Sequence, residues 1–196
     1  MKKQAVFLVL ITLFICSKAI SQSNFNNSEF APLNPENFNK VIDGKQVGLF
    51  LLKNGNLTAA ITNYGGRIVS LCAPDKNGQT ADVVLGFKTI DDYLKATGVY
   101  HGAIVGRVIG RIAKGTFELD GKTQSLTINN GANHQHGGLK GFHNQVWDVK
   151  TVTDSSLVLS YISVDGEMGY PGTLKVEATY QLTSNNELTL KLSATT

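Results

Sequence analysis

The chain has 196 residues, and its 18 lysines and arginines against 15 aspartates and glutamates give a formal net charge of +3. Three of the basic residues are lysines within the first 21 positions, where no acid occurs, so the remainder carries 15 basic and 15 acidic residues. A neutral chain without a basic stripe argues against binding to nucleic acid or to anionic lipid. The roughly 175 residues that follow are enough for one domain with its own core.

The first 21 residues have the pattern of a secretory signal peptide. Two lysines at positions 2 and 3 precede an apolar run at 5–16, and the residues at 19–21 suit a cleavage site before Gln22. The apolar run is shorter than the ~20 residues that cross a bilayer, which disfavours a retained membrane helix. We therefore expect an exported protein, periplasmic or extracellular, with no membrane contact once the signal is removed.

Removal of the signal leaves Cys72 as the single cysteine of the chain. No intramolecular disulfide is then possible, even in an oxidising compartment. Cys72 ends the apolar stretch 68–72, which predicts a small buried hydrophobic side chain.

Residues 22–40 are rich in Asn, Ser and Pro and lack apolar periodicity, which predicts a leader or linker. The pattern changes near Val47, where short alternating runs separated by turns begin. An Asn-Gly pair at 54–55 and an Asp-Gly pair at 120–121 are strong hairpin signals. The runs that flank these turns predict strands at 47–52, 57–62, 116–119 and 122–128.

The second half of the chain is dominated by β-branched, alternating segments. They predict further strands at 146–153, 156–164, 173–182 and 187–193, whereas only 90–96 has a helical pattern. Regularly spaced strands with few helices predict an all-β fold, an antiparallel sandwich or barrel, over residues 41–196.

All three arginines follow a glycine directly: Arg67, Arg107 and Arg111. Glycine permits close backbone approach, and the guanidinium group offers a rigid fork of donors to hydroxyl or carboxylate oxygens. Arg107 and Arg111 are four residues apart, so they are expected to share a face. Two interpretations stay open: structural arginines that tie loops to carbonyl groups, or ligand-binding arginines.

A polar loop, 129–138, crowds asparagines and glycines around His134 and His136, which an extended segment would place on one side. The two histidines could be metal ligands, although no other cluster at ligand spacing supports this. They could be turn and hydrogen-bonding residues, as is usual in such loops. One of them could bind substrate or transfer protons. His101 and His143 have no supporting cluster, and Trp147 is expected to pack in the core.

At these positions the sequence resembles the aldose 1-epimerase family, in five separated motifs that occur in the family's order. Together they cover about 47–196. The motifs are Asn63-Tyr64-Gly65-Gly66-Arg67-Ile68; Asp82-Val83-Val84-Leu85-Gly86-Phe87 with Tyr93; the G-R-x-x-N-R-I-A-x-G-x-F-like segment 106–117; Asn133-His134-Gln135-His136-Gly137-Gly138; and the D-G-x-x-G-Y-P-G-like segment 165–172.

The resemblance implies a galactose-mutarotase-like antiparallel β-sandwich (supersandwich) that interconverts the α and β anomers of free hexoses without cofactor or metal. A base removes the proton of the anomeric hydroxyl while an acid protonates the ring oxygen, and the ring opens and closes on either face. By motif, Arg111 and His136 would hold the sugar, with Gly110, Arg107 and Asn133 beside them. Gly110 stands where the family often has Asn, so one sugar contact is expected to be missing or made by the backbone.

The family's catalytic acid, a second histidine, and its base, a late glutamate, match no residue of this sequence and are expected beyond Thr196. The resemblance therefore covers an N-terminal portion whose sandwich is incomplete at its C-terminus, and we expect no mutarotase activity from this chain alone. Two alternatives stay open: a non-catalytic carbohydrate-binding module on the same sandwich, or a β-sandwich fragment without a ligand. The preferred sugar and the oligomeric state are not specified by the sequence.

Overall fold

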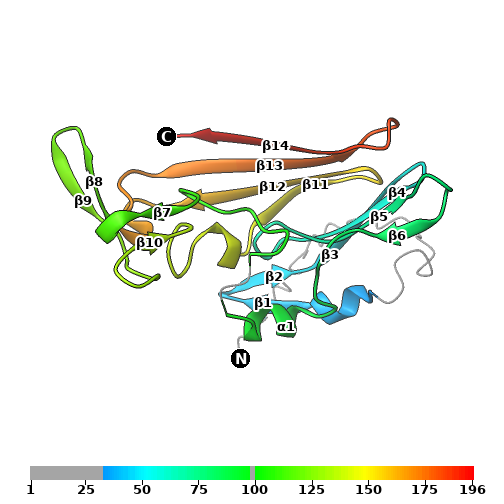
Figure 1. The fold of residues 1–196 in the computed structure, drawn as a ribbon, viewed down its shortest axis with the longest axis horizontal. Helices are drawn as coiled ribbons and strands as arrows, with labels where there is room; N and C mark the ends of the chain where they lie inside the picture. Colours follow the sequence, from blue (N-terminus) through cyan, green and yellow to red (C-terminus); the bar gives the residue numbers. More distant parts are fainter. Residues whose placement is uncertain (1–32, 98–99) are drawn as a thin grey trace, which may run out of the picture.

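The computed structural model of the protein describes residues 33–97 and 100–196. The predicted signal peptide, 1–21, and most of the predicted leader lie outside these residues. The described part consists mainly of antiparallel β-strands, which confirms the all-β prediction (Figure 1). None of its helices is long and apolar enough to cross a membrane.

The first large sheet has the order β3 (Leu49–Asn54), β4 (Leu57–Thr62), β5 (Arg67–Pro74) and β6 (Thr80–Asp82). The predicted Asn-Gly hairpin joins β3 to β4, and Gly55 has the positive φ of 56° that such a turn requires. Leu49 pairs with Thr62 at the far end of this hairpin.

The second large sheet is a meander of β11 (Asp148–Val152), β12 (Ser156–Ser163), β13 (Leu174–Leu182) and β14 (Leu188–Thr195). These bounds agree within a few residues with the strands expected from alternation. The burial of β13 alternates along the strand, with Val176, Ala178, Tyr180 and Leu182 buried. Successive side chains of a strand point to opposite faces, so one face of this sheet is packed and the other faces solvent.

The main hydrophobic core lies between the two sheets. It joins Leu52 and Ile61 of the first sheet to Leu159 and Tyr180 of the second, and Trp147 is completely buried within it, as the sequence predicted. Every residue of β4 is buried. Ala59 and Ile61 face this core, whereas Ala60 faces a second one, so β4 is covered on both faces.

The second core includes residues from the end of the segment predicted as a leader, 22–40. Pro35–Phe38 forms a 3₁₀ turn, η2, with Asn34 as its N-cap, and Phe38 is completely buried. Phe38 packs beside Tyr93 of the short helix α1 (Ile90–Lys95), and the hairpin of β1 (Lys40–Ile42) and β2 (Lys45–Val47) follows. The folded part therefore begins before residue 40, because one aromatic residue within a polar stretch anchors it.

Cys72 is also placed differently from the prediction. It lies on β5 and is half-buried rather than buried, with its sulfur 3.7 Å from Ser70 Oγ. The outer half of β5 pairs with the short, exposed strand β6, which leaves this end of the sheet less covered than its start.

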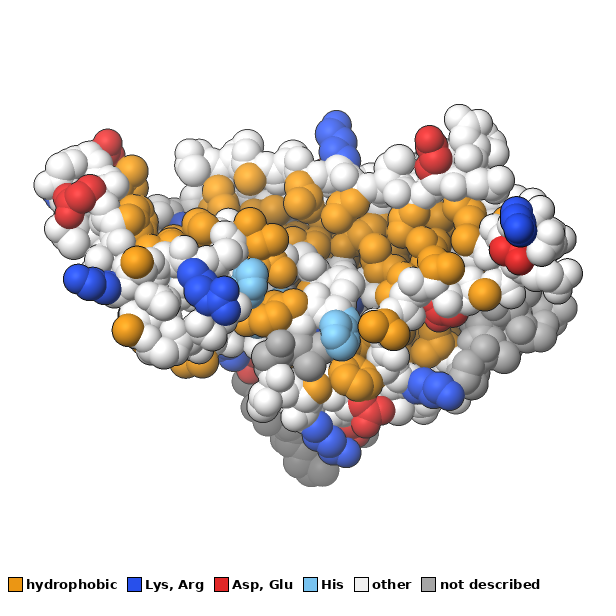
Figure 2. Space-filling model, in the orientation of Figure 1, with side chains coloured by type: hydrophobic (Ala, Val, Ile, Leu, Met, Phe, Trp, Pro, Cys, Tyr) orange, Lys and Arg blue, Asp and Glu red, His pale blue; other side chains and the backbone are white. Residues whose placement is uncertain are grey.

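Strand β14 is covered far less than β13. Leu190 pairs with Tyr180 and Leu192 with Ala178, so these leucines lie on the packed face of the sheet, yet they are 44% and 53% exposed. Figure 2 shows apolar side chains along the hollow face of the molecule below the uppermost strand.

Two small hairpins lie at one end of the second sheet, at the left of Figure 1. The first pairs β8 (Thr116–Leu119) with β9 (Lys122–Ser125) around the predicted Asp-Gly turn, and β9 ends three residues earlier than expected. The second pairs β7 (Arg111–Ile112) with β10 (His134–Gln135). Single 3₁₀ turns complete this region: η3 (Ala113–Gly115), η4 (Phe142–Asn144) and η5 (Glu167–Gly169).

Candidate functional site

The β7–β10 pair brings three of the five predicted site residues together. Gln135 pairs with Arg111, and the next residues along the two strands, His136 and Gly110, are joined by two hydrogen bonds. The His136 amide donates to the Gly110 carbonyl at 3.0 Å, and the Gly110 amide donates to His136 Nδ1 at 3.1 Å. Gly110 adopts a φ of 90°, which a residue with a side chain rarely does.

The hydrogen bond from Gly110 determines what His136 can offer to a ligand. An amide N–H can only donate, so Nδ1 must accept, and the neutral ring then carries its proton on Nε2. Nε2 has no hydrogen-bond partner among the described residues. The half-buried His136 ring is therefore held at one nitrogen and presents an N–H donor at the other.

Arg111 follows Gly110 as the first residue of β7 and is exposed. Its Nε donates to Asn130 Oδ1 at 2.9 Å, which fixes the base of the guanidinium group. Within the part of the chain that the structure describes, the two terminal nitrogens make no hydrogen bond. Arg111 and His136 together thus offer several N–H donors to a ligand, which suits the hydroxyl and ring oxygens of a sugar.

Arg107 does not share this face, contrary to the prediction from its spacing to Arg111. Its Nε donates to Ser163 Oγ at 2.8 Å, and its terminal nitrogens donate to the carbonyl oxygens of Ser163, Val164 and Pro171 at 2.9–3.0 Å. It also lies over the ring of Tyr170, 5.7 Å from the centroid. Arg107 is the structural arginine of the pair: it ties the 163–171 loop to the start of the site.

Asn133 is likewise engaged within the protein. Its Oδ1 accepts from the Lys114 amide at 3.2 Å, and its backbone forms a bridge with Asn130. The bridge between Asn133 and Asn130 therefore closes a short loop, and Asn130 in turn accepts the hydrogen bond from Arg111.

His134 and His136 do not lie on one side, because His136 has a left-handed φ of 53° and leaves the extended strand. His134 is completely buried. One ring nitrogen, Nδ1, lies 2.7 Å from the Thr127 carbonyl, and Nε2 lies 2.8 Å from the Tyr170 hydroxyl. Both nitrogens are thus occupied, and His134 acts as a structural support for the loop.

The sequence analysis missed a second support, centred on Glu167. Its carboxylate accepts hydrogen bonds from the hydroxyls of Tyr161 and Ser163, and from Gln145 Nε2 at 3.3 Å. Burial and the carboxylate together raise the pKa of the Tyr161 hydroxyl, so that it stays protonated and remains a donor. Ser163 also accepts from Arg107, so this network and the Arg107 contacts form one layer behind the site.

Tyr100 was not singled out from the sequence, yet its ring lies 4.6 Å from that of His136 and 4.6 Å from that of His143. His143 is buried and its Nδ1 has no partner in the described structure. Burial, with smaller effects from Arg67 and His136, lowers the pKa of His143 to about 4. The Arg67 guanidinium donates to the carbonyls of His143 and His101, at 2.8 Å and 3.3 Å, which makes Arg67 structural.

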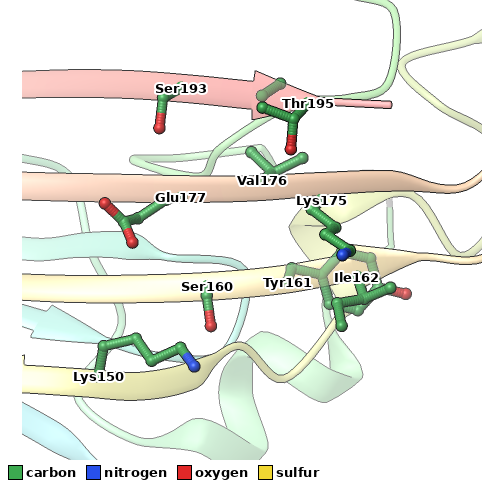
Figure 3. Close-up of a pocket in the computed structure, with 10 residues that line it drawn as sticks. Lys150, Ser160, Tyr161, Ile162, Lys175, Val176, Glu177, Ser193 and Thr195 are labelled. Atoms are coloured by element: carbon green, nitrogen blue, oxygen red, sulfur yellow. The ribbon is translucent and has the colours of Figure 1, made fainter.

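Two hollows differ in their distance from the β7–β10 pair: the first adjoins it, through Asn129, which is bonded to Gln135, and the second lies on the second sheet. The first, of about 330 Å³, is lined by Tyr64, Tyr93, Tyr100 and His143 among others. The other, of about 300 Å³, is a shallow groove on the second sheet, where Lys150, Ser160, Glu177 and Ser193 project from neighbouring strands (Figure 3). Its single aromatic residue, Tyr161, is buried against Phe142 and Trp147, so this groove offers no free aromatic platform for a sugar. No group of three or more potential metal ligands occurs among residues 33–97 and 100–196.

Comparison with known proteins decides the family. The family model for aldose 1-epimerase matches residues 48–196. The chain belongs to the aldose 1-epimerase family. The galactose mutarotases of pig and human are 47% and 45% identical to it over 133 and 139 residues, which cover 68% and 71% of this chain but 38% and 40% of theirs. The chain thus spans about two fifths of the length of these relatives.

Solved structures agree with this assignment. The aldose epimerase homologue of Caenorhabditis elegans superposes with a TM-score of 0.71 and 36% identity, covering 76% of this chain and 46% of that one. The galactose 1-epimerase of Lactobacillus acidophilus superposes with a TM-score of 0.68 and 29% identity, covering 79% and 46%. The antiparallel β architecture expected from the sequence is therefore that of the galactose mutarotases.

Proposed function

We propose that the β7–β10 face binds an aldose sugar and forms the sugar-binding part of an aldose 1-epimerase active site. The observation that carries this proposal is the Gly110–His136 pair. Its hydrogen bond leaves His136 Nε2 as a donor, and Arg111, which pairs with the residue before His136, has terminal nitrogens that no described residue uses. Hexoses are recognised through such donors to their hydroxyl and ring oxygens, and the family membership supplies the substrate class.

The epimerase reaction also needs an acid for the ring oxygen and a base for the anomeric hydroxyl. Two candidate groups near the site are engaged otherwise: both nitrogens of His134 are bonded, and the carboxylate of Glu167 accepts from three side chains. We therefore propose that this chain by itself binds the sugar without accelerating the interconversion of its anomers.

A non-catalytic carbohydrate-binding module is the second candidate. The same observation favours it, because a donor-rich surface suffices for weak binding. The two proposals differ in the role of the bound sugar, not in its position.

Binding can be tested by titrating the ¹⁵N-labelled full chain with galactose or glucose to about 100 mM and recording amide shifts. We expect shifts at Gly110, Arg111 and His136, and about a fivefold or greater loss of affinity in His136→Ala and Arg111→Ala, since each removes hydrogen bonds worth about 1 kcal/mol or more. Lys122→Ala, at the start of β9, is the matched control and should bind as the parent does. Absence of any sugar-dependent shift at these positions would overturn the proposal.

The catalytic question is separate, and polarimetry answers it. The decay of optical rotation of freshly dissolved α-glucose should proceed at the uncatalysed rate with the purified chain present. An acceleration that His136→Ala abolishes would show that the chain carries a complete catalytic set, and would refute the proposal of binding without catalysis.

A further inference from the structure

We propose that Tyr100 is a positioning residue for sugar recognition: its ring, packed at a tilt between the rings of His143 and His136, holds the His136 imidazole in the orientation that presents Nε2 to the ligand. This inference deepens the proposed function and rests on it for the identity of the ligand. The geometry of the stack itself does not depend on that function.

The orientation of His136 is not fixed by its backbone alone. The residue has a left-handed φ and is followed directly by two glycines of positive φ, Gly137 and Gly138. The hydrogen bond from the Gly110 amide fixes one edge of the ring, at Nδ1, whereas the other bond with Gly110 holds only the His136 backbone amide. A single contact at one nitrogen still allows the ring plane to tilt about that point, and a tilt would displace Nε2, which lies on the opposite edge.

Tyr100 supplies the missing constraint. Its ring centroid lies 4.6 Å from that of His136, with 57° between the two planes, within the range of favourable aromatic pairs. The Tyr100 hydroxyl has no hydrogen-bond partner in the described part of the chain. The ring, rather than the hydroxyl, is therefore the part of Tyr100 that contacts His136.

Tyr100 is in turn supported from behind. Its other neighbour is the His143 ring, also at 4.6 Å and 54°. His143 is only 4% exposed, and its carbonyl accepts a 2.8 Å hydrogen bond from the completely enclosed Arg67. The buried Arg67 thus holds the backbone of His143, and the Tyr100 ring lies between the His143 ring and the half-buried His136 ring.

The consequence for binding follows from the directionality of hydrogen bonds. An N–H donor loses strength steeply as its angle to the acceptor falls, so a His136 ring that tilts freely recognises a sugar oxygen less well. Aromatic pairs contribute enough to make the expected loss about twofold to tenfold in affinity.

The test uses Tyr100→Leu and Tyr100→Phe in the full chain, with two readouts. The first, without sugar, is the pair of imidazole ¹⁵N shifts of His136, which report whether Nδ1 accepts and Nε2 carries the proton. The second is galactose affinity. We expect Tyr100→Leu to average the two nitrogen signals and weaken binding about twofold to tenfold, whereas Tyr100→Phe, which keeps the ring, retains both parental values.

Each other outcome is informative. If Tyr100→Leu leaves the His136 signals and the affinity unchanged, or if Tyr100→Phe loses as much as Tyr100→Leu, the positioning role is wrong. If no variant, the parent included, binds galactose but the imidazole signals still respond to Tyr100→Leu, the proposed function fails and the positioning role stands. Trp147 fluorescence checks folding, and Tyr100→Met, which keeps apolar volume without a ring, replaces Tyr100→Leu if that variant unfolds.

Discussion

The candidate site has a front and a back with different physical character. The front, Gly110, Arg111 and His136, has donors that no described residue uses. The back, which includes Arg107, His134 and Glu167, has its hydrogen-bonding groups occupied by loop carbonyls and side chains. Residues of the two regions lie close together in the sequence: Arg107 is four positions from Arg111, and His134 is two positions from His136. The comparison shows that residues close in sequence differ in whether their polar atoms already have partners, and only those with unused donors can offer them to a ligand.

The largest expected effect comes from a glycine at the junction of the two regions. In Gly137→Ala, the new Cβ would lie 1.5 Å from the Gly106 carbonyl oxygen, and the backbone must also keep a φ of 83°. We expect a loss of about 4 kcal/mol or more in the free energy of unfolding, or failure to fold. Gly131→Ala is the matched control: it too has a positive φ, of 59°, but an added Cβ meets nothing within 4 Å.

Urea denaturation of the two variants measures the difference. Gly131→Ala should lose only about 1 kcal/mol, the cost of strain at a positive φ. Equal losses in both variants would mean that backbone conformation alone, and not the close contact with Gly106, makes the loop depend on glycine.

The next effect contrasts the two arginines of the segment 107–111. Arg107→Ala removes four hydrogen bonds and leaves carbonyls of the 163–171 loop without their donor, so we expect a loss of about 3 kcal/mol. Arg111→Ala removes one hydrogen bond, to Asn130, at an exposed position and should cost less than about 1 kcal/mol. Chemical denaturation tests stability, and sugar titration should show the reverse order. Comparable losses of stability in both variants would refute the division into front and back.

How much of this could be predicted from the sequence depends on the range of the interactions. Hairpins set by Asn54-Gly55 and Asp120-Gly121, and the alternating strands after Val146, were predictable because turn chemistry and period-two burial are local. Phe38 was missed, because its burial depends on Tyr93, which is distant in the sequence.

The site shows the same limit. Spacing placed Arg107 and Arg111 on one face, but the chain turns at Gly110, and no periodicity rule applies across such a turn. The motif resemblance, by contrast, selected Arg111 and His136, which the structure brings next to Gly110. Tyr100 could have been noticed only as an aromatic residue close before the Gly-Arg motif, a weak signal, since its stacking partners lie 36 and 43 positions away.

The smallest expected effect is the pH dependence of stability that arises from the buried His143. The pKa of His143 is about 4 in the folded chain against an ordinary value near 6.5, so the unfolded chain binds more protons between these values. The neutral His143 therefore makes its full contribution to the free energy of unfolding above about pH 6.5, and this contribution falls as the pH is lowered toward 4. Between pH 7 and pH 5 the expected loss is about 2 kcal/mol. Urea unfolding at the two pH values measures it.

His143→Phe keeps a ring against Tyr100 and cannot be protonated, so it isolates this contribution. The variant should lose about 2 kcal/mol less than the parent on going from pH 7 to pH 5, whatever the other titrating groups contribute. An identical pH dependence in parent and variant would show that His143 is not held neutral by its surroundings. The surroundings of the His143 ring would then be less tightly excluded from water than its burial indicates.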